Sequence, residues 1–248
     1  MDQQILDRFG IHSERATRIL DAAVTLLLRW GYKRVTMDDI ALEARVGTGT
    51  LYLHWKTKEA LFEAVLLREL ASLWNGIAQQ IRDTPSNVLL HRCLPLLLRA
   101  VKERPLARAL FTRDLSLLGK LGQGRLMQQS QQLLGTNTFI TTLRQLGLLR
   151  TDMDSAVQAQ AFSAIWTGFV LVDTIVRPPD QADLTIQLDA LAQTIRCTFE
   201  PDTFPDEVLL RDVVAPHIVD WLEQVCNQLA EQIAIRTISL SRDSRSQA

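Results

Sequence analysis

The stretch from Thr36 to Lys58 constrains the fold more than any other part of the chain. It reads T-M-D-D-I-A-L-E-A-R-V-G-T-G-T-L-Y-L-H-W-K-T-K. Thr36 with Asp39 three residues later is typical of a helix start that resembles a capping box. Gly47 and Gly49 then interrupt the helical pattern, because each glycine costs about 1 kcal/mol inside a helix. The stretch therefore predicts two short helices with a tight break between them.

The second short helix has a buried face and a displayed face. Leu51 and Trp55 lie four residues apart, so they share the apolar face. The other positions carry hydroxyls, a phenol and an imidazole, on Thr48, Thr50, Tyr52 and His54. Residues 44–58 contain basic side chains and no acid. A short polar helix of this kind suits the major groove of DNA, so the stretch predicts a helix-turn-helix.

Two runs of the sequence carry a family resemblance. Residues 46–61, V-G-T-G-T-L-Y-L-H-W-K-T-K-E-A-L, resemble the recognition-helix signature of the TetR family of transcriptional regulators. Residues 18–41, with the lead-in G-Y-x-x-x-T, extend the similarity, and together the runs cover 40 of 248 residues. The resemblance implies a three-helix DNA-binding head and a larger helical domain that dimerises and encloses a small-molecule pocket.

The same resemblance implies which residues contact DNA. Tyr52 matches a phenol that hydrogen-bonds a phosphate, and Lys58 matches a phosphate-binding lysine at a helix start, where free N–H groups also attract anions. Thr36 would cap its helix and offer its hydroxyl or N–H to phosphate. The full set expected at the interface is Thr36, Arg45, Gly47, Thr48, Gly49, Thr50, Tyr52, His54 and Lys58.

Several of these residues also have a purely structural interpretation. Tyr52 could pack beside the first helix, and His54 could be a solvated surface residue. Thr48 and Thr50 could serve only to start their helix. The sequence alone leaves both interpretations open.

Two positions depart from the family pattern. The family usually has glycine where this chain has Arg45, because the turn favours a positive φ, and another residue there costs about 1 kcal/mol. Arg45 also adds a cation near the DNA. Gly47 stands where serine often caps the recognition helix, and glycine is a tolerable cap. Both positions bear on the contact pattern more than on the fold.

Helical periodicity continues through the rest of the chain, without sustained period-two alternation, so the fold class predicted is all-α. A length of 248 residues suggests one or two domains. We expect a loosely ordered extension (1–12), a head (13–58), a helical ligand-binding and dimerisation domain (59–236) and a disordered tail (237–248). The expected helices are 13–30, 57–82 (which links the head to the rest), 87–103, 105–117, 123–146, 154–176, 183–198 and 206–236.

The larger domain offers weaker candidates. For a lipophilic pocket they are Trp74, Cys93, Leu97, Phe111, Phe162 and Trp166, with Arg99 and Arg113 as polar partners. For a dimer interface they are Ala159, Ser163, Thr167, Ile218, Leu222, Val225 and Leu229. Aromatic residues and apolar seams at helical spacing are also typical of an ordinary core.

Other function classes find little support. The cysteines, Cys93, Cys197 and Cys226, lie far apart, so neither a zinc site nor a disulfide framework is expected, and no metal or cofactor is predicted. The run 119–124, G-K-L-G-Q-G, lacks the order of a phosphate loop, and the four histidines are scattered, so we predict no enzyme. The chain starts without a signal-peptide pattern, and a cytoplasmic location is expected.

The function predicted is a homodimeric, sequence-specific DNA-binding regulator. It is interpreted as a repressor that a small lipophilic effector releases from double-stranded operator DNA. Two alternatives stay open: a DNA binder that answers to a protein partner, and a helical protein–protein adaptor with a degenerate head. Arg45 and Gly47 are the features that favour the adaptor.

Overall fold

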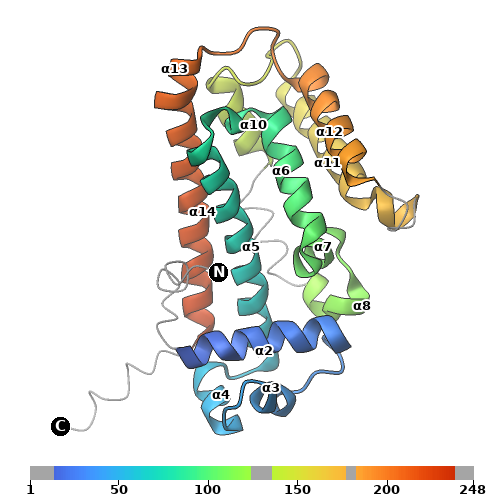
Figure 1. Ribbon diagram of the computed structural model, residues 1–248, viewed down its shortest axis with the longest axis vertical. Coiled ribbons are helices and arrows are strands. Elements are labelled where there is room, and N and C mark those ends of the chain that lie inside the picture. The colour runs from blue at the N-terminus through green and yellow to red at the C-terminus, as the bar shows by residue number, and fades with distance from the viewer. Residues whose placement is uncertain (1–13, 124–135, 177–182, 238–248) are drawn as a thin grey trace, which may run out of the picture. The chain divides into compact units, whose positions relative to one another are not determined.

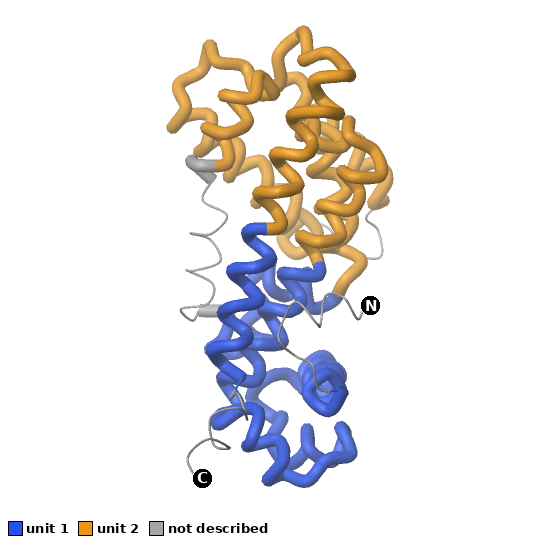
Figure 2. Tube along the Cα trace, turned by 90° about the vertical axis from the view of Figure 1, so that its left-hand side faces the viewer, with its two compact units in different colours: residues 1–72, 105–127, 224–248 blue, residues 73–104, 128–223 orange. Residues whose placement is uncertain are grey.

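The computed structural model describes residues 14–123, 136–176 and 183–237, and all regular elements within them are helical (Figure 1). The prediction of an all-α fold is confirmed. The chain forms two compact units (Figure 2). Unit 1 holds residues 1–72, 105–127 and 224–248, and unit 2 holds residues 73–104 and 128–223.

The first helices of unit 1 match the expected pattern closely. They are α2 (Glu14–Trp30), α3 (Met37–Glu43), α4 (Thr48–His54) and the start of α5 (Lys58–Asp83). One face of α2 is buried, including Ile19, Leu20 and Leu27. Gly31 ends α2 with a φ of +74°, a left-handed conformation that glycine adopts without strain. We refer to residues 14–58 as the head.

The single helix predicted over 105–117 is wrong, because the chain turns at Arg113. Helix α7 (Pro105–Thr112) ends there, and α8 (Leu115–Leu118) and the 3₁₀ turn η2 (Gly119–Gln123) follow. Arg113 has a φ of 52°, and the N–H groups of Arg113 and Asp114 bond the carbonyls of Leu110 and Ala109. These bonds form a Schellman motif, which stops a helix.

Unit 2 is built from helices that pack side by side. They are η1 (Pro85–Val88), α6 (Leu90–Glu103), α10 (Thr136–Gln145), α11 (Ser155–Ile175), α12 (Leu184–Phe199), α13 (Glu207–Leu209) and the π-helical turn η4 (Leu210–Val214). Helix α6 packs on α12, and α10 packs on α11. The last helix, α14 (Ala215–Arg236), contributes residues to both units, as does α5.

The helix predicted over 206–236 is interrupted near Pro216. Proline lacks the N–H that an α-helix needs and clashes with the preceding turn. The chain widens there into the π-turn η4, in which the N–H of Ala215 bonds the carbonyl of Leu210. The regular helix α14 follows the turn.

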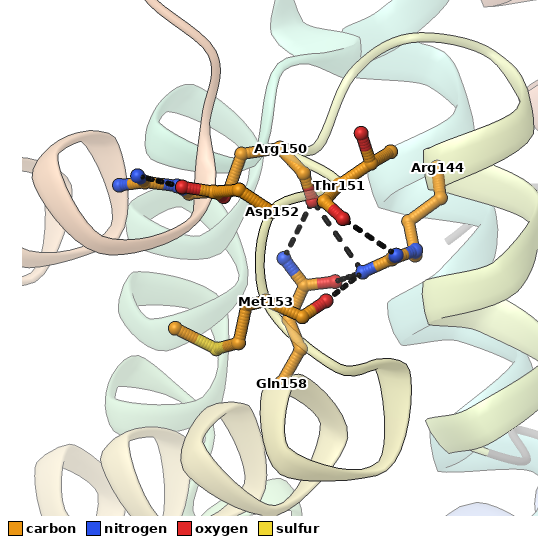
Figure 3. Close-up of polar contacts among 6 residues, drawn as sticks. All are labelled: Arg144, Arg150, Thr151, Asp152, Met153 and Gln158. Atoms are coloured by element: carbon orange, nitrogen blue, oxygen red, sulfur yellow. Dashed lines mark hydrogen bonds and ion pairs between the residues drawn. The ribbon is translucent and has the colours of Figure 1, made fainter.

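Arg144 fastens the loop between α10 and α11 (Figure 3). Its guanidinium donates to the carbonyl of Met153 and to Oε1 of Gln158, each at 2.8 Å. Gln158 is fully buried, and its Nε2 donates to the carbonyl of Arg150 at 3.1 Å. The loop backbone is therefore satisfied by two side chains, one from each helix.

Two further polar ties join distant segments of unit 2. His91 bonds the buried carboxylate of Glu200 with its backbone N at 3.0 Å and its Nδ1 at 2.6 Å. Lys102 forms an ion pair with Asp173, which also accepts a bond of 2.8 Å from Nε2 of Gln187. These ties connect α6 to the end of α12, and α6 to α11 and α12.

Some of the predicted segments cannot be compared. The extension 1–12, residues 124–135 of the helix predicted over 123–146, and the tail from 238 onward lie outside the described residues. The functional boundary between 58 and 59 stays a prediction. The compact unit that contains the head also takes in 105–127 and 224–248.

Candidate nucleic-acid interface

A full capping box starts α3, as the sequence indicated. The hydroxyl of Thr36 accepts from the N–H of Asp39 at 3.2 Å, and Oδ2 of Asp39 accepts from the N–H of Thr36 at 2.9 Å. Bonds from Thr36 lower the pKa of the Asp39 carboxyl, so it stays ionised. A cap of this type stabilises a helix start by about 1 kcal/mol. Thr36 is exposed, so its backbone and hydroxyl lie at the surface.

The turn between α3 and α4 keeps a left-handed residue although that residue is arginine. Arg45 has a φ of 55°. Its N–H bonds the carbonyl of Leu42 at 3.1 Å, and the N–H of Val46 bonds the carbonyl of Ala41 at 2.9 Å. This is a Schellman motif with arginine at the position where glycine is usual. The predicted positive φ is confirmed, and the exposed guanidinium lies at the turn.

Helix α4 anchors one face and displays the other. Gly47 is its N-cap, with φ −69° and ψ 143°, and no side chain caps the helix. Leu51 and Trp55 are fully buried. The hydroxyl of Thr48 donates to Oδ1 of Asp38 at 3.0 Å, which ties the start of α4 to α3.

The displayed face carries four of the residues predicted to contact DNA, which are Thr48, Gly49, Thr50 and Tyr52. Tyr52 is 47% exposed, which excludes the alternative that its side chain packs fully against the first helix. Thr50 is half-buried, and a side chain added at Gly49 would meet nothing within 4 Å. The open space at Gly49 shows that its lack of a side chain is not required by the packing of the free protein.

The interpretation of His54 as a residue that reaches DNA is wrong. Only 7% of His54 is exposed, and its ring lies 5.5 Å from that of Trp55. Burial, followed by the charge of Arg15, lowers the pKa of His54. The position was misjudged because the sequence showed only two clearly apolar residues on the buried face of this short helix.

Lys58 lies at the first turn of α5, where the sequence placed a phosphate-binding lysine. Thr57 caps the helix by accepting from the N–H of Ala60 at 3.1 Å. The Nζ of Lys58 lies 4.3 Å from the centre of the Tyr32 ring, within the range of a cation–π contact. Burial and then the charge of Lys120 lower the pKa of Lys58.

Sequence reasoning missed two residues of this region. Leu53 is 52% exposed on α4, next to Tyr52, and a leucine there can contact a thymine methyl group. Tyr32 is buried and supports Lys58. The signal for Leu53 was present in the spacing, because a position two residues from both Leu51 and Trp55 lies on the opposite side of an α-helix.

Comparison with known families agrees with this geometry. Residues 19–65 match the model of the bacterial regulatory proteins of the tetR family, which spans α2, α3, α4 and the first turns of α5. Over these residues the chain is similar to the TetR family. It is a transcriptional regulator of the TetR type with a helix-turn-helix head.

The similarity to named relatives extends beyond the head. The regulator YvkB of Bacillus subtilis is 28% identical over 154 residues, which cover 62% of this chain and 80% of YvkB. The transcriptional repressor KstR of Rhodococcus jostii is 28% identical over 191 residues, covering 73% of this chain and 82% of KstR. The regulator FadR of Bacillus subtilis, solved in complex with stearoyl-CoA, is 17% identical with a TM-score of 0.55, over 72% of this chain and 96% of FadR. The FadR match shows a shared fold.

The residues predicted for a pocket in this TetR-type regulator fall in different settings. In unit 2, Trp74 and Leu97 are buried, while Cys93, Phe162 and Trp166 are half-buried. Burial raises the pKa of the Cys93 thiol to about 12, so the thiol stays protonated. The rings of Phe139 and Phe199 lie 6.2 and 6.1 Å from that of Phe162. Phe162 therefore belongs to an aromatic cluster of the unit 2 core.

The two arginines predicted as polar partners of the ligand do not fit that role. Arg99 is exposed and pairs with Glu103, one helical turn along α6, at 3.7 Å. Arg113 is the exposed turn residue that ends α7. Phe111, which the prediction grouped with them, is half-buried and belongs to unit 1.

The residues predicted for a dimer interface also fall into buried and accessible groups. Ile218, Leu222, Val225 and Leu229 of α14 are buried within the single chain, so these side chains are not free to meet a partner helix, and that part of the prediction is wrong. Ala159 of α11 is buried as well, whereas Ser163 is half-buried and Thr167 is exposed. Helix α11 retains the exposed positions of the predicted stripe.

Helix α11 leaves much of its surface uncovered in the single chain. By length and composition alone it could cross a membrane, but the core helices of soluble proteins pass the same test. Only Gln158, Ala159 and Val170 are buried along its 21 residues. An exposed apolar surface of this extent is typical of an interaction site.

Proposed function

We propose that this regulator is a homodimeric, cytoplasmic repressor that binds operator DNA through α4 and is released by a lipophilic effector. The observation that carries the proposal is the displayed face of α4, bordered by two helix starts and two basic side chains. Tyr52 is exposed on it, Arg45 lies before it and Lys58 lies after it. Base-edge contacts need such polar groups in the groove, and phosphate contacts need the flanking cations.

The proposed contacts have separate roles. Thr48 and Thr50 face base edges or phosphates, with Thr48 also held by Asp38. Tyr52 and Lys58 bond phosphates, as does the helix start at Thr36. The positions of Arg45, Gly47 and Gly49 bring cation and backbone close to the DNA. The left-handed turn at Arg45 preserves the break between α3 and α4 that a helix-turn-helix needs, although glycine is absent.

A second copy of the chain supplies the partner for α11. Its exposed or half-exposed face runs along Gln160, Ala164, Thr167, Gly168, Leu171 and Ile175. Small residues at helical spacing allow two helices to approach closely, and an apolar surface of this length is normally covered. A dimer also places two heads on two half-sites. An Ala164→Arg variant is expected to sediment as a monomer, while the wild-type chain sediments as a dimer.

The effector is proposed to be a lipophilic small molecule that binds in unit 2. Trp74, Cys93, Leu97, Phe162 and Trp166 are mostly apolar candidates. The solved FadR of the same fold binds stearoyl-CoA, which makes acyl-CoA thioesters a rational first probe. Helix α5 is continuous from Lys58 to Asp83, so a change at one end can reach the other without a soft linker. The proposed release follows from a shift toward a state that cannot span both half-sites.

The first test is selection of DNA from a random pool by the purified chain. An enriched palindrome is expected, and its affinity should fall with salt because phosphate contacts release counterions. Tyr52→Phe removes one hydroxyl contact and should weaken binding about fivefold. Lys58→Ala should lower the slope of log affinity against log salt by about 0.9.

Arg211→Ala serves as the charge-matched control, since Arg211 is an exposed cation of unit 2. Its affinity for the selected DNA should equal that of wild type. Folded, dimeric protein that enriches no sequence would move the assignment to the adaptor or to a binder that needs its effector. Stearoyl-CoA that neither stabilises the chain nor releases DNA would favour a regulator that answers to a protein partner.

A further inference from the structure

A short segment from later in the chain is tied to the head within unit 1. We define the strap as residues 114–121, which hold α8 and the start of η2. Asp114 caps α8 by accepting from the N–H groups of Ser116 and Leu117 at 2.8 and 3.2 Å. The carbonyl of Leu117 accepts from the N–H of Tyr32 at 2.8 Å. Figure 1 shows α8 beside the end of α2, just before the chain reaches α3.

Two glycines let the strap and the head approach closely. Gly119 has a φ of +54°, and a Cβ there would lie 3.1 Å from Cδ1 of Tyr32. Gly31 has a φ of +74°, and a Cβ there would lie 3.1 Å from the carbonyl oxygen of Ser116. Each side of the contact thus has a glycine where a side chain would be strained and crowded. The strap therefore packs directly on Tyr32.

Tyr32 joins the strap to the lysine that is proposed to bind phosphate. The Nζ of Lys58 lies 4.3 Å from the centre of its ring, and the ring of Phe62 meets it edge-on at 5.4 Å. Tyr32 is 7% exposed, so its position is set by these neighbours and by the strap. Lys58 and the strap consequently rest on the same side chain.

The strap also pairs with the acid that follows Lys58. The Nζ of Lys120 lies 2.7 Å from Oε2 of Glu59. This bond raises the pKa of Lys120, so the amine stays charged. Both side chains are accessible, with 63% and 49% of their surfaces exposed. Without Lys120, the Glu59 carboxylate would be uncompensated next to Lys58 in the sequence and would repel a nearby phosphate.

We infer that Lys120 is a positioning residue for DNA binding, which holds and neutralises Glu59 so that α5 presents Lys58 to a phosphate. The inference rests on the proposed DNA binding through Lys58. Lys120 itself does not contact the DNA. An exposed ion pair contributes little to folding, so the effect of Lys120 appears in DNA affinity and not in stability. Displacement of the strap would uncover Glu59 and weaken DNA binding without any change in α4.

The test measures affinity for the selected DNA at several salt concentrations. Lys120→Gln should weaken binding about fivefold, the size expected for one partly screened charge interaction. Its salt slope should equal that of wild type, because the number of phosphate contacts does not change. Adding Glu59→Gln to Lys120→Gln should restore the affinity. Lys120→Arg should bind as wild type does. Because residues 59 and 120 are exposed, the unfolding midpoints should agree.

Three outcomes overturn the inference. They are an unchanged affinity in Lys120→Gln, a loss that Glu59→Gln does not restore, and a salt slope reduced by about 0.9, which would make Lys120 a direct phosphate contact. The proposed function fails separately. Its failure would appear in the wild-type chain, as absence of DNA binding, or in Lys58→Ala, as an unchanged salt slope, and neither measurement involves residue 120.

Discussion

The head and unit 2 fix their polar groups over different distances along the chain. In the head, the bonds that set the helix starts are local. Thr36 pairs with Asp39 at the start of α3, and the hydroxyl of Thr57 accepts from the N–H of Ala60 at the start of α5, each across three residues. In unit 2, His91 reaches Glu200 across 109 residues, and Lys102 reaches Asp173 across 71. Local bonds shape helix ends, which leaves polar side chains at the surface for a ligand. Long-range pairs hold helices together and use up the polar groups that form them.

Two histidines, one in the head and one in unit 2, also differ in their surroundings. His54 of the head is buried beside Trp55, and its environment favours the neutral imidazole. His91 of unit 2 bonds a fully buried carboxylate and stacks on Phe204 at 6.0 Å. One histidine therefore fills space, and the other hydrogen-bonds a buried carboxylate. The two should respond very differently to substitution.

The largest effect is expected at His91. His91→Ala leaves the Glu200 carboxylate buried with only a backbone N–H, and breaking a buried pair on one side costs about 3 kcal/mol. The free energy of unfolding in urea should fall by that amount. Replacing both partners, as in His91→Leu with Glu200→Leu, should recover much of it. His217→Ala is the control, because His217 is exposed on α14. Equal losses for His91→Ala and His217→Ala would contradict the long-range role of the pair.

The contrast also explains which parts of the fold were predictable. The capping box, the glycine end of α2 and the two-turn helix α4 follow from residues within four positions of one another, and their sequence signals were sufficient. The His91–Glu200 pair could not be predicted, because nothing near either residue marks the other. The end of α7 was missed for a related reason, since arginine in the left-handed region at 113 has no sequence signal.

Within the candidate site, too, the sequence predicted some positions and failed at others. Thr36, Tyr52 and Lys58 were placed at or near the surface by pattern and resemblance, and the structure agrees in placing Tyr52 outward. His54 was misplaced, because a helix of seven residues leaves its last turn undetermined by periodicity. The support of Lys58 by Tyr32 depends on the strap, which lies more than eighty residues further along the chain.

A second effect is expected at the left-handed turn of the head. Arg45→Gly should raise the free energy of unfolding by about 1 kcal/mol, because glycine adopts a φ of 55° without the clash of a Cβ. It should also weaken DNA binding and lower the salt slope if the guanidinium lies on a phosphate. Arg113→Gly is the matched control, with a φ of 52° in the same kind of helix stop. It should gain similar stability. A salt slope lowered equally by both variants would remove Arg45 from the interface.

The third effect is a loss of stability at acid pH, which does not occur at neutral pH. The pKa of His54 is lowered in the folded chain below its ordinary 6.5, so just below that pH the unfolded chain binds a proton that the folded chain does not. The contribution to stability is therefore complete above about 6.5 and is lost as the pH falls through the folded pKa. His54→Leu should flatten this part of the pH profile of unfolding. A His54→Leu profile that matches wild type would show that folding does not lower the pKa of His54.

The smallest effect is expected at the N-cap of α4. The side chains of Thr36 and Thr57 cap α3 and α5, whereas Gly47 has no side chain that could cap α4. Gly47 has cap dihedrals that any residue adopts, and a Cβ there would meet only the hydroxyl of Thr50, at 3.9 Å. Gly47→Ser should therefore add a hydroxyl that accepts from the N–H of Gly49 or Thr50, with a gain of a few tenths of a kcal/mol. Gly47→Ala adds the same Cβ without the oxygen, so it should be less stable than the serine variant by about 1 kcal/mol. Urea unfolding of the wild-type, serine and alanine proteins measures this difference. Equal stabilities of the serine and alanine variants would mean that no side chain at 47 reaches the free N–H groups.

The same serine variant also tests the contact with DNA. A stabilised Gly47→Ser that binds DNA more weakly would show that the backbone at this position must approach the DNA more closely than a side chain permits.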